Sequence, residues 1–375
     1  MKPEIFSEIG PLEQVFVYSP GEEHNLVLPL DVQPFLVKEN QIVKNKEFLL
    51  FDDIVDLKIA KKQHQTFREI INFYKEGSCI DIRENFLNIL ESENISSKFP
   101  LINLMYPRDI AAIIGNQIYL TSSSSVVRKT ENFLSESFFN NKSDYKECEI
   151  IDFKKIGNGL SLEGGDIFVI NREIVLIGIS ERTSKEAIDL IIPYIFNQEF
   201  EHVIAVDLPK ERAMMHLDTI FTQTSYNEGI LFNHPNYNID QLNVYFASKN
   251  SKSQKLIEHQ FKLIDLLNDL KFNLIPCGGN NENFQLREQL TDGANSFVLE
   301  PGKILMYNCN QKTISELEKN NYKHITSDLF YNNLLTFEKI LKSDSKVVIS
   351  IDGSELVKGR GGPRCMTLPI KRKSI

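Results

Sequence analysis

The sequence predicts an α/β fold made of repeated units that close on themselves, and two observations support this. Short hairpins recur along the chain, because apolar and β-branched runs flank turn signals at 110–121, 166–178, 219–232 and 296–307. A helical pattern and then a single apolar strand follow each of the last three, and these strands lie at 202–207, 272–277 and 346–351. Four or five copies of such a strand–strand–helix–strand unit usually close, since one copy alone cannot bury its apolar face.

The helices predicted within these units lie at 183–196, 253–270 and 313–320. The first and the third contain a Thr followed three residues later by a Glu, which is the spacing of a capping box: Thr183 with Glu186, and Thr313 with Glu316. The second has an apolar face at helical spacing, formed by Leu256, Phe261, Ile264 and Leu267.

A first copy of the unit begins at 12–20, and the segment 51–98 then interrupts the pattern of repeated units. This segment has an apolar stripe at helical spacing, formed by Ile54, Leu57, Phe67, Ile70 and Tyr74. We therefore expect helical material that belongs to the first unit or is inserted in it. No Pro-, Gly- or Ser-rich linker divides the chain, so residues 1–375 are expected to form a single domain.

The composition excludes several classes of function. The formal net charge is −9 with both signs mixed throughout, so no basic stripe suggests a nucleic-acid partner. The N-terminus lacks a signal-like apolar core and no run of 18 apolar residues occurs, so we expect no membrane span. Five scattered cysteines without a CxxC pair disfavour a disulfide framework or a metal site. A reducing, cytoplasmic location fits this cysteine usage.

Unusual polar residues stand just before each hairpin: Arg108 and Asp109, 163–166, His216 and Asp218, and 292–295. If the units surround an axis, these positions lie at one end and converge on one pocket. Two arginines strengthen the pattern, because Arg128 follows Asp109 by 19 residues and Arg182 follows Glu163 by 19 residues. Two arginines at equivalent repeat positions can jointly hold a carboxylate.

The stretch 359–369, GRGGPRCMTLP, carries Cys365. Its glycines exclude a helix and let the backbone pass close to a ligand, while Arg360 and Arg364 would favour the thiolate. A thiol together with His216 indicates covalent nucleophilic catalysis. Carboxylates on two sides suit a planar guanidinium, and Asp109 and Asp218 are the candidates for gripping it. The structural alternatives are an inert cysteine, a core histidine, capping carboxylates and loop-capping arginines.

These residues resemble a known family, the bacterial arginine deiminases of the guanidine-modifying, amidinotransferase-like superfamily. The matching stretches are NLMYPRD at 103–109, LEGGD at 162–166, SERT at 180–183, and the segments 204–222 and 353–369. The resemblance implies a five-bladed, pseudo-symmetric α/β propeller of ββαβ units with a reduced helical insertion at 51–98. It also implies that Tyr106 stands where the family usually has Phe.

The resemblance further implies a role for each site residue. Cys365 would be the nucleophile, His216 the general acid and base, and Glu163 its support. Asp109 and Asp218 would bind the guanidinium. The residues implied for the rest of the substrate are Asn103, Arg128 and Arg182 at the amino-acid end, and Arg360, which closes over it.

The implied reaction is hydrolysis of L-arginine to L-citrulline and ammonia through a covalent amidino-cysteine intermediate, without a metal or organic cofactor. Carboxylates near Cys365 would raise the pKa of its thiol until the substrate's own cation binds. The alternatives are a related guanidine-modifying enzyme, such as an amidinotransferase or a hydrolase of substituted arginines, and a non-enzymatic arginine-binding protein. The sequence does not fix the oligomeric state, and a homo-oligomer is compatible with it.

Overall fold

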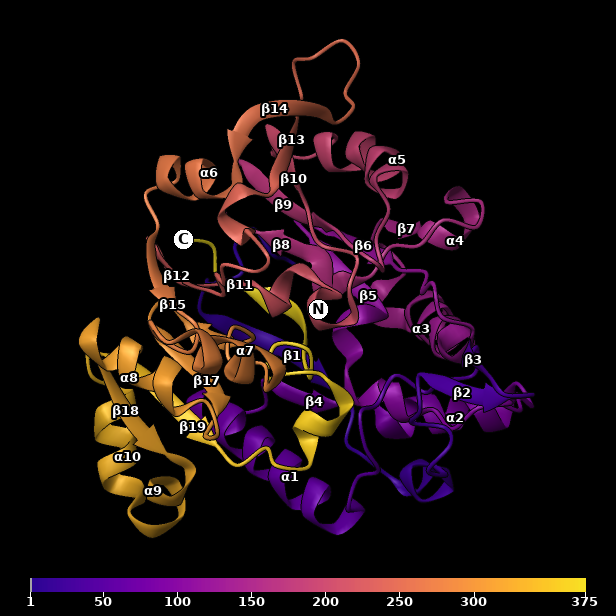
Figure 1. The fold of residues 1–375 in the computed structure, drawn as a ribbon, viewed down its shortest axis with the longest axis horizontal. Coiled ribbons are helices and arrows are strands. Elements are labelled where there is room, and N and C mark those ends of the chain that lie inside the picture. Colours follow the sequence, from indigo (N-terminus) through magenta and orange to yellow (C-terminus); the bar gives the residue numbers. More distant parts are fainter. Residues whose placement is uncertain (1) are drawn as a thin grey trace.

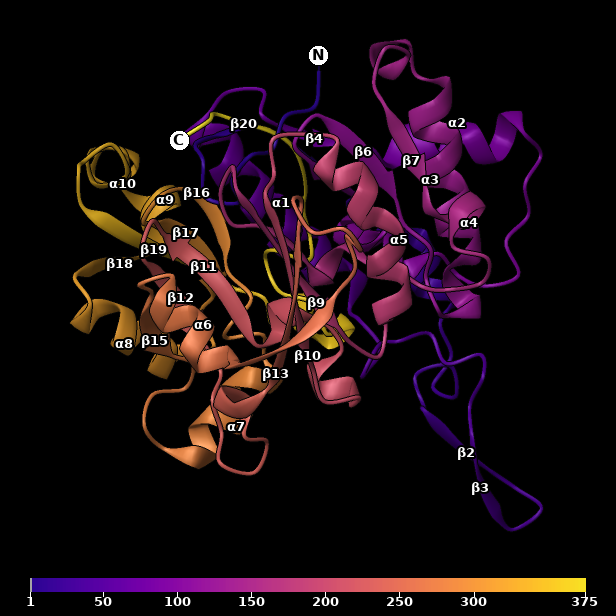
Figure 2. The same ribbon diagram turned by 90° about the horizontal axis from the view of Figure 1, so that it is seen from above.

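The computed structural model describes residues 2–375 and contains five sheets built on one pattern (Figure 1). In each, an antiparallel pair of strands is followed by a strand parallel to the second of the pair. The recurring strand–strand–helix–strand unit predicted from the sequence is therefore present, and the fold is a mixed α/β one. A sixth sheet is the hairpin of β2 (Phe35–Lys38) and β3 (Gln41–Lys44), which projects from the rest of the molecule in Figure 2.

The strands of the five repeated sheets have the following bounds: β20 (Leu368–Arg372), β1 (Leu12–Val17) and β4 (Cys79–Asp81); β5 (Ala111–Ile114), β6 (Gln117–Leu120) and β7 (Ile150–Asp152); β8 (Ile167–Val169), β9 (Ile174–Ile179) and β10 (His202–Asp207); β11 (Phe221–Ser225), β12 (Glu228–Leu231) and β15 (Asn273–Pro276); β16 (Phe297–Glu300), β17 (Lys303–Tyr307) and β19 (Lys346–Ile351). All four predicted hairpins and all three predicted single strands are confirmed.

Each parallel connection passes through helical structure, as a parallel pair requires. The connecting helices are α1 (Leu57–Tyr74), α3 (Lys129–Asn141), α5 (Lys185–Phe196), α6 (Leu263–Asp269) and α8 (Gln311–Lys319). The other α-helices of the described residues are α2 (Arg83–Ser92), α4 (Phe153–Ile156), α7 (Glu282–Leu290), α9 (Ser327–Asn332) and α10 (Leu334–Leu341). Strand β9 is buried along its whole length, because neighbouring layers cover both of its faces.

The first repeated unit is assembled from both ends of the chain. Strand β20, near the C-terminus, pairs antiparallel with β1, and β1 pairs parallel with β4 after helix α1. Helix α1 thus occupies the connecting position of this unit, and α2 follows β4. The segment 51–98 is mainly helical, as expected. Because Cys365 lies three residues before β20, this terminal pairing also fixes the position of the cysteine loop.

The prediction of one helix over 253–270 was wrong. The structure has β14 (Ile257–Lys262), which pairs with β13 (Asn243–Ser248), and only then α6. Strand β13 pairs with β10, so this hairpin extends the sheet of the third unit to five strands. Ile257 and Phe261 are exposed, so the apolar spacing in this segment does not mark a buried helical face.

Both predicted capping boxes were also wrong, because the hydroxyl groups of Thr183 and Thr313 bond with residues distant in the sequence instead of capping a helix. Helix α5 begins at Lys185, and Ser184 caps it by accepting a hydrogen bond from the Ala187 backbone N–H at 3.1 Å. Thr313 lies inside α8, where the carboxylate of Glu288 accepts its backbone N–H at 2.8 Å and its hydroxyl at 2.7 Å. A carboxylate from α7 therefore satisfies the free amides at the start of α8.

Strand β18 (Tyr322–Thr326), next to β19, was not predicted. Among residues 2–375, no helix is both long enough and apolar enough to cross a membrane.

Candidate active site

Three short 3₁₀ turns, at Pro107–Asp109, Gly164–Asp166 and Leu217–Thr219, stand immediately before β5, β8 and β11. The second turn contacts both of the others, so polar residues far apart in the sequence meet at one place, as the repeat pattern predicted. Asp166 links two of the turns, because its carboxylate accepts the backbone N–H of Leu217 at 2.9 Å and the hydroxyl of Ser180 at 2.6 Å.

A closed cavity lies where these turns meet. Its lining consists of Leu50, Asn103, Tyr106, Asp109, Arg128, Glu163, Arg182, Met215, His216, Gly359, Arg360 and Cys365. Eight of the nine predicted site residues are in this set. The ninth, Asp218, lies behind Cys365, with Oδ2 3.4 Å from Sγ. The cavity has a volume of about 20 Å³, which is room for about one water molecule. It is therefore too small for a larger ligand in this conformation.

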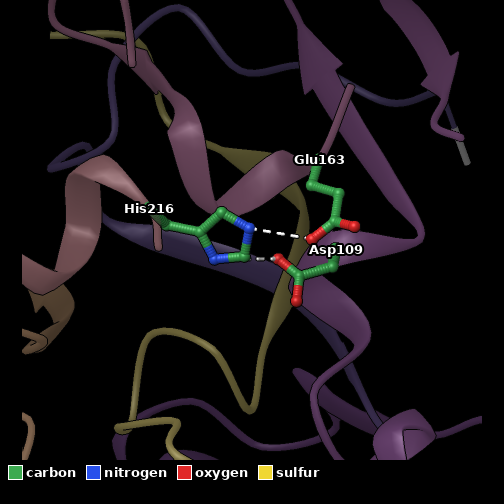
Figure 3. Close-up of side chains that lie close together, drawn as sticks. All are labelled: Asp109, Glu163 and His216. Atoms are coloured by element: carbon green, nitrogen blue, oxygen red, sulfur yellow. Dashed lines mark hydrogen bonds and ion pairs between the residues drawn. The ribbon is translucent and has the colours of Figure 1, made fainter. Parts of the chain in front are cut away.

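His216 lies between two carboxylates (Figure 3). Its Nε2 is 2.9 Å from Oε2 of Glu163, and its Nδ1 is 3.8 Å from Oδ1 of Asp109. Burial disfavours the charged imidazolium, but Asp109, the hydrogen bond with Glu163 and the charge of Asp166 outweigh it and raise the pKa of His216 well above its usual range. The imidazole is therefore held protonated, as a proton donor.

The local sequence explains how this histidine fits. A Cβ at Gly165 would lie 2.5 Å from Nδ1 of His216, so the second glycine of LEGGD gives the ring its space. Burial opposes ionisation of Glu163, but the hydrogen bond with His216 and the charge of Arg182 lower the pKa of its carboxyl. Ser123 also donates a hydrogen bond to Glu163. The result is a buried ion pair between Glu163 and His216.

Asp109, Glu163 and His216 each offer one ligand atom within 4.8 Å of the others, which is the spacing of a metal cluster. Arg128, however, donates to Asp109 at 2.7 Å, and Arg182 lies 3.9 Å from Glu163. Guanidinium groups beside both carboxylates would repel a cation at this place. We therefore interpret the cluster as a proton-transfer group.

Cys365 is 5% exposed, and its sulfur is surrounded by acids. Burial, followed by the charges of Asp218, Asp109 and Asp292, raises the pKa of this thiol well above its usual range. Arg364 favours the thiolate, as expected, but burial and the acids outweigh its effect on the thiol pKa. Its guanidinium donates to Asp218 at 2.8 Å and to Glu8 at 3.0 Å. The expectation that carboxylates raise the thiol pKa in the substrate-free protein is confirmed in direction.

The glycines of the cysteine loop pack against protein side chains, and Gly359 also lines the cavity. A Cβ at Gly359 or Gly361 would lie 2.2 or 2.4 Å from atoms of the Tyr106 side chain. The Tyr106 hydroxyl also donates to the carbonyl of Leu356. Arg360 has φ 57° and donates to the Leu290 carbonyl at 2.9 Å, with its Nε 3.5 Å from Asp52. Contacts at Leu356 and at Arg360 thus hold the loop in place on either side of Gly359.

The two arginines at equivalent repeat positions have different surroundings. Arg128 donates to Asp109 and Glu131, both at 2.7 Å, and more weakly to the backbone oxygens of Asn103 and Tyr106. The guanidinium of Arg182 has a single ion pair, the 3.9 Å contact with Glu163, and its buried Nε has no hydrogen-bond partner among the described residues.

A family model described as arginine deiminase matches residues 84–372, most of this sequence. The chain belongs to the arginine deiminase family. The arginine deiminase of Borreliella burgdorferi is 30% identical, over 99% of this chain and 98% of that protein. That of Mycoplasma capricolum is 30% identical, over 100% and 98%. The predicted family is therefore confirmed.

Solved structures of lower identity share the fold of this family member. The N-terminal domain of ArgZ, described as a cyanobacterial arginine dihydrolase, has a TM-score of 0.58 at 12% identity, over 96% of this chain and 98% of that one. The dimethylarginine dimethylaminohydrolase of Pseudomonas aeruginosa, in complex with citrulline, has a TM-score of 0.55 at 16% identity, over 96% and 99%. At these identities the likeness concerns the fold alone.

Arginine deiminase relatives are longer than this family member. The alignment with the Borreliella protein runs over 445 positions, whereas this chain has 375 residues, so the relative carries insertions.

Two further residues of the site had no predicted role. Asn295 lies in a polar stretch that the repeat pattern did single out, 292–295, and it contacts Cys365. Glu8 pairs with Arg364 and, at 3.4 Å, with Arg108, although it stands far from both in the sequence.

Proposed function

We propose that the protein hydrolyses L-arginine to L-citrulline and ammonia, with Cys365 as the nucleophile. One observation carries the proposal: in a chain of the arginine deiminase family, a thiol, a protonated histidine and carboxylates border one buried cavity. The family membership supports action on the guanidino C–N bond, and the arrangement of the cavity supports the role of each residue.

The unsatisfied groups of the site match the two ends of arginine. Oδ1 of Asp218 is buried and has no hydrogen-bond partner among the described residues, so it is free to accept an N–H of a guanidinium. The guanidinium of Arg182 is free to hold the α-carboxylate in the same way. Arg128 is already saturated by protein acceptors, so we assign it to fixing Asp109, with Asn103 beside it.

In the first step, the substrate cation enters beside Asp109 and Asp218 and lowers the pKa of the Cys365 thiol by supplying the missing positive charge. As the cation binds, the thiol releases its proton to solvent, and the thiolate forms a bond to the guanidinium carbon. The tetrahedral centre collapses as its C–N bond breaks, and His216 gives its proton to the departing ammonia. An amidino-cysteine thioether remains. Such acid catalysis contributes about 10²–10⁴-fold.

In the second step, His216 has lost its proton and is a base. It removes one proton from a water that attacks the thioether carbon. The C–S bond then breaks and the adduct's remaining hydroxyl proton leaves to solvent, which releases citrulline and the thiolate. Glu163 and Asp109 stabilise the imidazolium that forms again. Their contacts with Nε2 and Nδ1 of His216 thus serve both steps.

Substrate entry requires an opening, because the present cavity is far smaller than arginine. A larger pocket of about 610 Å³ shares Leu50 and Arg182 with it and is bordered by Phe35 and Lys44 of the β2–β3 hairpin. We assign this pocket to the entrance, which places Arg182 between solvent and the thiol. Arg360, which also lines the small cavity, would close over the bound substrate.

The wider architecture follows from the same family. We propose that the five similar sheets are the blades of a five-bladed α/β propeller around the cavity, in a single domain over 1–375. The pairing of β1 with β20 supports closure of the ring. We place the protein in the cytoplasm, because all five cysteines are free thiols, which fits a reducing compartment.

A panel of guanidino compounds tests this function. Purified protein should release equimolar ammonia and citrulline from L-arginine, and much less product from methylated arginine, agmatine and guanidinoacetate. Replacing Cys365 with Ala should abolish turnover while the thermal unfolding transition remains. Citrulline formation by the Cys365→Ala variant would overturn the assigned nucleophile, and a preference for methylated arginine or for an amidino acceptor would favour a related guanidine-modifying enzyme.

A further inference from the structure

Asn295 is a fully buried side chain beside the reacting sulfur, and the mechanism above gives it no role. It lies between α7 and β16, just before the first strand of its unit. Asp109 and Asp218 occupy the corresponding positions before β5 and β11. The fifth unit therefore contributes a neutral amide to the site where two other units contribute carboxylates.

Both ends of the Asn295 amide are engaged with the cysteine loop. Oδ1 accepts hydrogen bonds from the backbone N–H groups of Arg364 at 3.0 Å and Cys365 at 3.2 Å. Nδ2 donates to Sγ of Cys365 at 3.1 Å and to the backbone oxygen of Asp218 at 3.2 Å. Because two backbone donors require the oxygen on their side, the N–H₂ group must face the sulfur.

The backbone of the loop is shaped for this contact. A Cβ at Gly362 would lie 2.6 Å from Oδ1 of Asn295, so only a glycine there lets the two segments approach so closely. One side chain thereby fixes the backbone and the sulfur of the same cysteine. The contact also links the fifth unit, through Asp218, to the fourth unit, which carries His216.

The charge of the surroundings gives this contact its chemical importance. Burial and the charges of Asp218 and Asp109 disfavour the Cys365 thiolate. An N–H donor to the sulfur favours the charged form. Since the amide is neutral, it gives this stabilisation without the repulsion that a cation would exert on a guanidinium substrate.

We propose that Asn295 stabilises the thiolate of Cys365 through Nδ2 and holds the sulfur in its attacking position through Oδ1. This inference rests on the proposed function for its consequence in turnover, but the thiol's own titration can be measured without any substrate. A failure of Asn295 to affect the thiol is thus distinguishable from a failure of arginine to be the substrate.

The test measures alkylation of Cys365 by iodoacetamide in the substrate-free protein, from neutral to alkaline pH. Reaction at Cys365 is followed by peptide mass spectrometry, because the other four cysteines are also free. In Asn295→Ala, the apparent pKa of the thiol should rise by about one unit, which lowers the rate near neutrality about tenfold. With arginine, kcat/KM should fall about 10- to 100-fold, mainly in kcat, the size of one lost hydrogen bond to a charged group.

Asn310→Ala is the matched control. Asn310 is equally buried and bonds with Thr291, away from the cavity, so this variant should lose stability without a change in the thiol pKa. A second variant, Asn295→Ser, keeps a small polar group and should also raise the pKa. An unchanged thiol pKa in a folded Asn295 variant overturns the proposal. Loss of folding in both Asn295 variants, with Asn310→Ala folded, makes Asn295 a folding residue and overturns it too.

Discussion

The second and third repeated units place a carboxylate before their first strand and an arginine 19 residues later, yet they use the pair differently. In the second unit, Arg128 binds Asp109 at 2.7 Å. In the third, Arg182 stays 3.9 Å from Glu163, and the carboxylate binds His216 at 2.9 Å. The same scaffold positions therefore give a fixed ion pair in one unit and a free arginine beside a charged histidine in the other.

A single position explains much of this difference. Three residues after Arg128 stands Glu131, which is buried and binds the arginine at 2.7 Å. Three residues after Arg182 stands Lys185, whose charge cannot hold a guanidinium and which pairs with Asp189 instead. A second carboxylate thus draws Arg128 into the protein, whereas Arg182 keeps its hydrogen-bonding capacity for a ligand. The comparison separates a structural arginine from a binding one.

The largest effect is expected from Glu163→Gln, which removes the carboxylate charge that the third unit places against His216. Turnover should fall about 10²–10⁴-fold because the acid–base histidine loses its partner. The pKa of His216 is raised in the wild type, so its proton, and activity, are lost only as the pH rises through that raised value. In the variant this alkaline loss should begin at lower pH, and pH profiles of kcat measure it. An unshifted alkaline limb would contradict the assignment.

Arg128→Ala should have the next largest effect, and on stability. The change leaves Asp109 and Glu131 as buried acids without their partner, which costs about 3–5 kcal/mol. Denaturant unfolding measures the loss. Arg182→Ala is the matched variant, and it should change stability far less, because its guanidinium makes one long ion pair. Equal losses in both would remove the distinction between the two units.

Arg182→Ala should instead impair binding. If Arg182 holds the α-carboxylate, KM for arginine should rise about 30-fold or more, because truncating one partner of a buried charge pair costs about 2–5 kcal/mol. Agmatine, which has no carboxylate, provides the internal control, since its kinetics should change little. Initial rates with both compounds decide the point. A similar loss for arginine and agmatine would show that Arg182 acts elsewhere.

The smallest effect is expected from Tyr106→Phe, which restores the residue that is usual in the family. It removes the hydrogen bond from the Tyr106 hydroxyl to Leu356, a contact between the second unit and the cysteine loop, at a cost of about 0.5–1.5 kcal/mol. Thermal unfolding should show a small decrease, with kcat/KM within about threefold of the wild type. A large loss of activity would mean that this hydroxyl positions the loop for catalysis.

Much of the fold was predictable because its signals are local. Hairpin turns between apolar runs, such as 110–121, act within a dozen residues and were all confirmed. The β13–β14 hairpin was missed because the exposed residues of 257–262 happen to have helical spacing. The capping Thr at 183 was misassigned because its hydroxyl accepts the backbone N–H of Glu163, a distant residue.

For the candidate site, too, one part could be predicted from the sequence and another could not. Eight of nine predicted residues border one cavity, since a repeated unit brings equivalent positions together. The state of each group was less predictable. Arg364, next to Cys365 in sequence, neutralises Asp218 and Glu8, so its neighbour gains little from its charge. Glu8 had no predicted role, because only the fold brings it beside Arg364 and Arg108.

The sequence alone determined which groups this protein brings to its chemistry: a thiol on a glycine-rich loop, a histidine, and acids and arginines at fixed repeat positions. The tertiary structure decided their charge and freedom: a high thiol pKa, a protonated His216, a saturated Arg128 and an open Arg182. The reason is physical. Residue type and spacing are covalent properties, whereas ionisation and pairing depend on burial and on distances of a few ångströms, which only the complete fold sets.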